Sequence, residues 1–354
     1  MNIDPGLFEE SERTTPQAEG RQFVEVGSLD LERGGHLGSA TIAYQTWGKP
    51  DPSNAILVCH AISGDSNAVG WWPRLVGPGK AIDTDRYWVI CSNVIGGCQG
   101  STGPLSGDFP FVTLGDMVEA QSRLMDHLSI PQWQLVCGGS MGGMQAIEWA
   151  RRFPSRTKGV WATASALRHS AMQIGFNEVA RQSIFRDPRW QGGNYTDQGP
   201  TDGLAVARML GHLTYLSEPA FEAKFGRRLQ EGDVKVPDAG ATFAKREVFQ
   251  VENYLAHQGH KFTERFDART FVVVSNAIDT YDCTALPESD TRFLFTSFTS
   301  DLLYPSWQSQ TANELALGSG HESTWLDINS PLGHDAFLLD ENEQASAVHT
   351  LLGN

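Results

Sequence analysis

The most constraining feature of this sequence is a serine set among glycines between a strand-like and a helix-like stretch, in residues 135–150. The stretch reads Leu-Val-Cys-Gly-Gly-Ser-Met-Gly-Gly-Met-Gln-Ala-Ile-Glu-Trp-Ala. It starts as an apolar run typical of a buried strand, and its second half has the apolar spacing of a helix. Gly138 and Gly142 permit the tight backbone that raises a serine at the apex of a strand-to-helix turn. We therefore predict a nucleophile elbow at Ser140.

Two other structures are compatible with the motif Gly138-x-Ser140-x-Gly142. One is a glycine-rich loop whose serine only caps the helix, and the other is a phosphate-binding loop. The order of strand, turn and helix favours the elbow over both.

The composition indicates a globular protein without nucleic-acid, metal or disulfide chemistry. The 354 residues are 40% hydrophobic and 19% charged, which suits one large α/β domain with an insertion or two ordinary domains. A formal net charge of -15 disfavours a nucleic-acid surface. The five cysteines form no C-x-x-C pair and are odd in number, so we expect reduced thiols, with neither a metal site nor a disulfide framework.

The sequence gives no sign of membrane insertion or secretion. No apolar run approaches the roughly 20 residues of a membrane span. Residues 1–20 are polar and acidic, without the basic start and apolar centre of a signal peptide. We therefore expect a flexible N-terminal arm over 1–20, no membrane partner and a cytoplasmic location.

In the first half of the chain, runs of strand character alternate with helical spacing. The strand candidates, which begin with an antiparallel hairpin, are residues 24–31, 40–47, 55–60, 87–92, 133–137 and 157–164. A helix is predicted over 114–128 with Thr113 as its N-cap. Such alternation predicts crossover connections and a largely parallel sheet.

The alternation breaks over residues 165–287, where the pattern is mainly helical. Strand-like runs resume at 292–296 and 323–327, and a closing helix is predicted over 337–352. The predicted fold class is α/β, with a mostly parallel central sheet flanked by helices and an inserted helical cap. The predicted division is an arm at 1–20, a catalytic core at 21–164 and 288–354, and a cap or lid at 165–287.

A serine nucleophile needs a general base and a third group that orients the base. On a nucleophile elbow the chain order is nucleophile, acid, histidine, and the acid and histidine lie on loops after later strands. Asp301 and His334 meet this order, so we predict a triad of Ser140, Asp301 and His334. Either residue alone would more simply be a surface or packing residue. His60 is a rival base, but it precedes Ser140, and we interpret it as part of a loop scaffold.

An oxyanion formed at Ser140 needs backbone N–H donors. The residue after the nucleophile supplies one, which here is Met141. We predict the second donor in the turn after the strand at 55–60, at Ile62.

Several segments together resemble the homoserine O-acetyltransferases and their relatives, the homoserine and serine O-acyltransferases of the α/β-hydrolase fold. The matching segments are 60–65, 71–72, 83–87, 92–104, 138–145, 174–177, 207–210 with 214–215, 249–254, 261–267, 300–301 and 333–337. They cover the chain from about residue 23 to its end, so the resemblance implies an α/β-hydrolase fold throughout.

The resemblance implies a ping-pong acetyl transfer from acetyl-CoA, as co-substrate, to the hydroxyl of L-homoserine, with no bound cofactor. It also implies that Arg208, Tyr215 and Asp335 bind the acceptor and that the protein is a homodimer through its cap. The chemistry agrees, because an arginine fork suits the carboxylate of an amino acid and an aspartate suits its ammonium group.

Four alternatives to homoserine acetylation remain open. Gly100-Ser-Thr-Gly-Pro104 is a form also associated with succinyl transfer, but the segment after Asp301 lacks the arginine that would pair with a succinyl carboxylate, so acetyl is favoured. Serine is one methylene shorter than homoserine, a difference worth only ~1–3 kcal/mol in a pocket. The others are a serine esterase or thioesterase and, from a different class, a binding protein without catalysis, which would be expected to lack a triad member.

Overall fold

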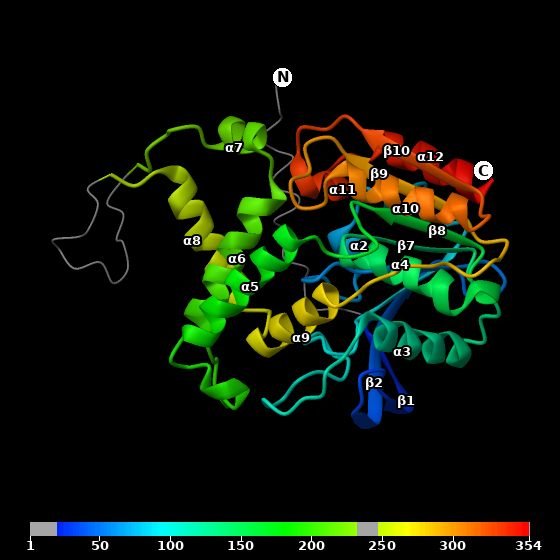
Figure 1. Ribbon diagram of the computed structural model, residues 1–354, viewed down its shortest axis with the longest axis horizontal. Coiled ribbons are helices and arrows are strands. Elements are labelled where there is room, and N and C mark those ends of the chain that lie inside the picture. The colour runs from blue at the N-terminus through cyan, green and yellow to red at the C-terminus, as the bar shows by residue number, and fades with distance from the viewer. Residues whose placement is uncertain (1–19, 232–246, 354) are drawn as a thin grey trace.

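The structure is a computed structural model that describes residues 20–231 and 247–353 (Figure 1). Apart from Gly20, the arm expected at 1–20 lies outside the described residues, as does part of the expected cap. Within the described residues, no helix is long and apolar enough to cross a membrane.

The centre of the described chain is an eight-stranded sheet with the order β1-β2-β6-β3-β7-β8-β9-β10. Its strands are β1 (Gln22–Asp30), β2 (His36–Trp47), β3 (Ala55–Cys59), β6 (Trp88–Ser92), β7 (Leu135–Gly139), β8 (Gly159–Thr163), β9 (Arg292–Phe298) and β10 (Ser323–Ile328). The β1–β2 and β2–β6 pairs are antiparallel, and all other neighbours are parallel. The predicted edge hairpin and the largely parallel sheet are therefore confirmed. A separate short parallel pair consists of β4 (Val76–Gly77) and β5 (Ile82–Asp83).

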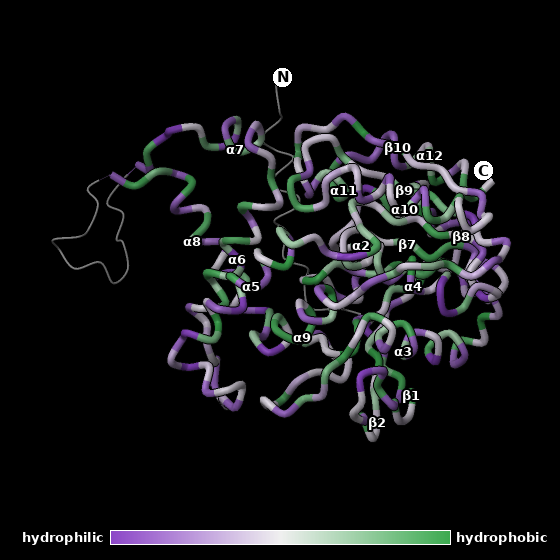
Figure 2. Tube along the Cα trace, in the orientation of Figure 1, coloured by the Kyte–Doolittle hydropathy of each residue, from purple (hydrophilic) through white to green (hydrophobic). Residues whose placement is uncertain are grey.

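Helices cover both faces of this sheet, which explains why its central strands are nearly continuous apolar runs. Leu57 of β3 packs in one core with α3 (Leu114–His127), α4 (Met141–Arg152) and α10 (Ser306–Gly318). Its neighbour Ile56 packs in the other core with residues of α2 (Ala68–Trp71) and α12 (Asn342–Leu352). Figure 2 shows hydrophobic stretches along β7 and β8 between these layers. The Thr113 side chain caps α3 as predicted, by accepting a hydrogen bond from the Asp116 N–H.

Residues 165–287 contain a group of helices beside the sheet (Figure 1). They are α5 (Ala171–Arg186), α6 (Thr201–Tyr215), α7 (Glu218–Lys224), α8 (Gln250–Thr263) and α9 (Ala268–Asp279). The group has a small apolar core of its own, which includes Ile184, Leu204 and Phe262. We refer to these helices and their connections as the cap.

The predicted single closing helix over 337–352 is wrong in one respect. The chain forms α11 (Ala336–Leu339) and then α12 after a break. The break lies at Asp340, whose φ of -100° and ψ of 86° are not helical. The sequence pattern missed it because both pieces bury apolar residues against the same core.

Candidate active site

Ser140 lies at a sharp bend between β7 and α4. Its φ of 57° and ψ of -124° are rare for a residue with a side chain, and its N–H donates to the carbonyl of Thr163 at 3.0 Å. Close packing around the bend requires glycine on both sides. A Cβ atom at Gly138 would lie 2.4 Å from the carbonyl oxygen of Cys59, and one at Gly142 would lie 2.1 Å from the same oxygen. The backbone around Ser140 therefore has the geometry expected of a nucleophile elbow.

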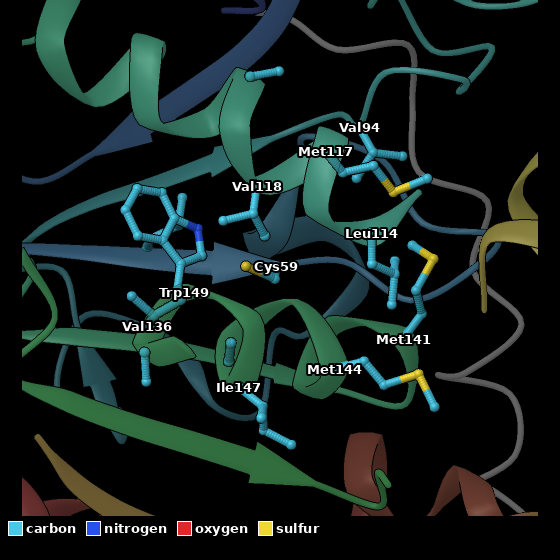
Figure 3. Close-up of a cluster of buried hydrophobic side chains, with 14 of the residues drawn as sticks. Cys59, Val94, Leu114, Met117, Val118, Val136, Met141, Met144, Ile147 and Trp149 are labelled. Atoms are coloured by element: carbon cyan, nitrogen blue, oxygen red, sulfur yellow. The ribbon is translucent and has the colours of Figure 1, made fainter. Parts of the chain in front are cut away.

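The helix that follows the bend is held by core packing. Figure 3 shows side chains of α4 next to side chains of α3, among them Met141, Met144, Leu114, Met117 and Val118. The Met141 side chain is fully buried in this core, so only its backbone can face the site. Its N–H belongs to the first turn of α4, where backbone donors have no partner within the helix.

His334 and Asp301 form a buried pair on loops that follow later strands. The His334 Nδ1 lies 2.8 Å from one Asp301 carboxylate oxygen. The other carboxylate oxygen accepts the N–H groups of Leu303 and Tyr304, each at 2.8 Å. Both side chains are at most 4% exposed. This arrangement fixes the carboxylate and directs the Nδ1 proton of His334 to it, which leaves Nε2 available for chemistry.

Two cavities meet at Ser140, which lines both of them. The first, of about 720 Å³, has mostly apolar walls that include Phe262, Phe266 and Phe271. The second, of about 960 Å³, is lined by both Ser140 and His334. The structure thus brings the predicted serine and histidine to the wall of one cavity.

Charged side chains of both signs line the second cavity. They are Arg208 and Arg265 from the cap, and Asp65 and Asp335 from the core. Burial raises the pKa of Asp335 to about 6, although His334 and Arg208 act in the opposite direction. Burial and the neighbouring Arg208 lower the pKa of Arg265. Two cations and two anions give a cavity that is balanced in charge, as a zwitterionic ligand requires.

Arg208 and Tyr215 come from the same face of α6, as their spacing predicts, and both line both cavities. The Arg208 guanidinium lies 5.5 Å from the centre of the Tyr215 ring and 4.8 Å from that of Phe262. These contacts hold the guanidinium at the cavity wall. Burial raises the pKa of Tyr215, so its hydroxyl stays protonated and can donate a hydrogen bond.

His60 is tied into the loop scaffold by both ring nitrogens. Nδ1 lies 2.7 Å from the Ala61 carbonyl oxygen, and Nε2 accepts the N–H of Val94 at 3.1 Å. Burial lowers the pKa of His60, which agrees with a neutral ring. The ring therefore has no free nitrogen to offer Ser140, and it holds the turn that contains Ile62. Ile62 itself lines both cavities beside Ser140.

Sequence reasoning assigned no role to Asp65, Arg265, His212 or Tyr304, which all line one of the cavities. Burial and the nearby cations Arg208, Lys224 and Lys261 lower the pKa of His212 to about 2, so its ring is neutral. Asp65 and Arg265 lie inside segments that carried the family resemblance, and that membership was the only available signal for them.

A mostly parallel sheet covered by helices on both faces, with a serine at a strained strand-to-helix bend and a histidine–aspartate pair from later loops, defines the class of α/β-hydrolase-fold proteins. The family model described as alpha/beta hydrolase fold matches residues 54–313.

Comparison with known proteins gives the family. A homoserine O-acetyltransferase of Gluconobacter oxydans is 46% identical, over 90% of this chain and 89% of that protein. A homoserine O-acetyltransferase of Rhodospirillum rubrum is 45% identical, over 89% of this chain and 87% of that protein. Among solved structures, esterase E22 has a TM-score of 0.82 at 25% identity, over 94% of this chain and 99% of its own. The chain belongs to the homoserine O-acetyltransferase family.

Proposed function

We propose that this protein transfers an acetyl group from acetyl-CoA to the hydroxyl of L-homoserine through an acyl-serine intermediate. The observation that carries the proposal is the charge-balanced cavity at Ser140, where Arg208 and Asp335 offer both charges that an amino-acid zwitterion needs. The names of the relatives at 45–46% identity support the same reaction.

In the first half-reaction, Ser140 Oγ attacks the thioester carbonyl carbon and gives its proton to His334 Nε2. Asp301 keeps the imidazole in the required tautomer through its contact with Nδ1. The N–H groups of Met141 and Ile62 hold the oxyanion. The tetrahedral intermediate then collapses, and the thiolate leaves with the proton from His334 as free CoA thiol.

In the second half-reaction, the homoserine hydroxyl gives its proton to His334 and attacks the acetyl carbon on Ser140. Collapse returns the proton from His334 to Ser140 Oγ and releases O-acetylhomoserine. Arg208 binds the acceptor's carboxylate with help from the Tyr215 hydroxyl, and Asp335 binds its ammonium group. Because the pKa of Asp335 is about 6, its carboxylate is mostly ionised at neutral pH.

The walls of the first cavity favour a small apolar acyl group. Leu303 stands on this wall, two residues after Asp301, and four phenylalanines line the space. Arg208 also lines this cavity, but here it binds the carboxylate of the acceptor, so a succinyl carboxylate would lose hydration without a cation of its own, which is costly. We therefore propose acetyl rather than succinyl as the transferred group.

The cap, residues 165–287, is proposed as the lid that limits access of water to the acyl-enzyme. Its helices α5 and α6 also expose large apolar side chains, with Met172 at 64%, Val179 at 60% and Val206 at 50%. Such a surface suits a second copy of the chain, so we propose a homodimer through the cap. A native molar mass equal to that of one chain would contradict this. We also propose that the protein acts in the cytoplasm, within methionine biosynthesis.

The proposal is tested by assaying acetyl-, propionyl- and succinyl-CoA, each with homoserine and with serine. Both the release of CoA thiol and the mass of the acylated product are recorded. We expect thiol release to depend on homoserine and to be fastest with acetyl-CoA. Ser140→Ala should abolish release while thermal unfolding stays cooperative. Thiol release at the same rate with and without an acceptor would instead indicate a thioesterase. This is the second candidate function, and the structural similarity to esterase E22 supports it.

A further inference from the structure

A second aspartate–histidine pair lies beside the first and is not used by the proposed mechanism. The His169 Nδ1 lies 2.8 Å from an Asp279 carboxylate oxygen, and the His169 Nε2 lies 2.7 Å from the hydroxyl oxygen of Tyr304. All three side chains are buried, with His169 5% exposed and Asp279 8%. A chain of hydrogen bonds therefore runs from the cap residue Asp279 to Tyr304 in the core.

Tyr304 contacts two members of the proposed triad, Asp301 and His334. Its N–H donates to the Asp301 carboxylate at 2.8 Å, and its ring stacks on the His334 ring with 5.0 Å between centroids and 19° between planes. Burial raises the pKa of Tyr304, against a smaller lowering effect of the Ser140 side chain. Ser140, His169 and Tyr304 line the first cavity together.

The neighbours of Asp279 decide the direction of the hydrogen bonds. Its carboxylate also accepts Asn177 Nδ2 and an Arg181 N–H, each at 2.7 Å. Because a carboxylate only accepts, Asp279 receives the Nδ1 proton of His169, and the Nε2 of a neutral ring is an acceptor. His169 Nε2 then accepts the Tyr304 O–H, so the cap holds the tyrosine whose ring stacks on His334.

We propose that Tyr304 is a positioning residue that holds the His334 ring in place for its reaction with Ser140, and that Asp279 and His169 hold Tyr304 in turn. The proposal rests on the proposed role of Ser140 as nucleophile. Asp279 ends α9, and Asn177 and Arg181 lie on α5, so both anchoring elements belong to the cap. The general base is in this way coupled to the cap.

The experiment measures acylation of Ser140 by the burst of p-nitrophenolate from p-nitrophenyl acetate, which needs no CoA binding. Tyr304→Phe removes the hydroxyl but keeps the ring on His334 and the N–H on Asp301. We expect its burst rate constant to fall about tenfold, the value of one neutral hydrogen bond, with an unchanged midpoint in the pH profile. The burst rate constant of His169→Ala should fall by a similar or smaller factor. His169→Gln should recover most of the rate, because its amide oxygen accepts the Tyr304 O–H.

A double mutant tests whether the two residues act in one chain. In a protein that already carries Tyr304→Phe, adding His169→Ala should not lower the burst rate constant further. Tyr195→Phe is the matched control, because its buried hydroxyl bonds Asp267 of the cap at 2.9 Å, so we expect it to lower thermal stability with a normal burst.

A wild-type burst rate in folded Tyr304→Phe, or additive losses in the double mutant, would overturn the inference. If Tyr304→Phe does not fold, equal burst rates in His169→Ala and the wild-type protein would overturn the inference instead. Ser140→Ala separates the two hypotheses, because a burst that survives in it contradicts the nucleophile itself, whereas a lost burst leaves only the positioning role in question.

Discussion

Asp335→Asn should stabilise the protein while impairing its use of the acceptor. In the folded protein burial raises the pKa of this carboxyl from 3.8 to about 6. Below pH 3.8 the carboxyl is protonated in both the folded and the unfolded state. Between pH 3.8 and about 6 only the folded state keeps the proton, so stability falls as the pH rises through this window. Above about pH 6 the loss of unfolding free energy caused by burying the ionised carboxylate is constant, at about 3 kcal/mol. Asparagine does not ionise and avoids it.

The expected gain in unfolding free energy is therefore close to zero at pH 4 and rises to as much as about 3 kcal/mol at pH 8. Urea denaturation at pH 4, 6 and 8 measures it. The kinetic effect has the opposite sign, because the ammonium group of homoserine loses its buried charge partner, which costs about 2–5 kcal/mol. We expect kcat/KM for homoserine to fall at least about 30-fold, while the burst with p-nitrophenyl acetate stays within about twofold.

Asp340→Asn is the matched control, since Asp340 lies five residues further along and is absent from the walls of both cavities. It should leave the acceptor kinetics unchanged. A stability difference for Asp335→Asn that does not vary with pH would refute the argument from ionisation. Unchanged acceptor kinetics would remove Asp335 from the acceptor site.

Three further outcomes follow from the site and its packing. Arg208→Ala should lower kcat/KM for homoserine about 100-fold in steady-state assays, through loss of the carboxylate fork, and leave the burst intact. Asp301→Asn should slow the burst in stopped flow by about 10⁴-fold at neutral pH, because an amide favours the wrong tautomer of His334. Gly139→Ala should lower the unfolding free energy in urea by about 1–3 kcal/mol or more, since its Cβ would lie 2.3 Å from the Phe337 ring. Gly175→Ala on α5, where nothing lies within 4 Å, should instead raise it by about 0.5–1 kcal/mol, and equal effects would contradict both arguments.

The sheet was predictable because strands covered on both faces are short, continuous apolar runs. The predicted strands at 55–60 and 87–92 correspond to β3 and β6 to within one residue at each end. Ser140, Asp301 and His334 were predicted together because an elbow fixes their order along the chain. The helix α10 was not predicted, because its start, Ser306-Trp-Gln-Ser-Gln, lacks a clear apolar period.

The contacts of Tyr304 were beyond the reach of sequence patterns. Tyr304 and His169 are 135 residues apart, and His169 and Asp279 are 110 apart. Nothing local marks any of them, since a buried histidine is most often a satisfied core residue. Only the folding of the cap onto the sheet brings these side chains together. The break at Asp340 was missed for the related reason that tertiary packing overrides local helical spacing.

Strain in the backbone does not by itself locate the site, because Ser129, Ala164 and Gln191 also have positive φ values. At Ser140 the strain coincides with a second local cost, the burial of the Asp335 carboxylate in the same cavity. Each feature destabilises the fold, and their joint presence on one wall is expected where selection acts on chemistry rather than on stability. This coincidence supports the proposed active site without reference to relatives. It also explains why the substitution that removes the buried charge, Asp335→Asn, is expected to stabilise the fold and weaken the enzyme.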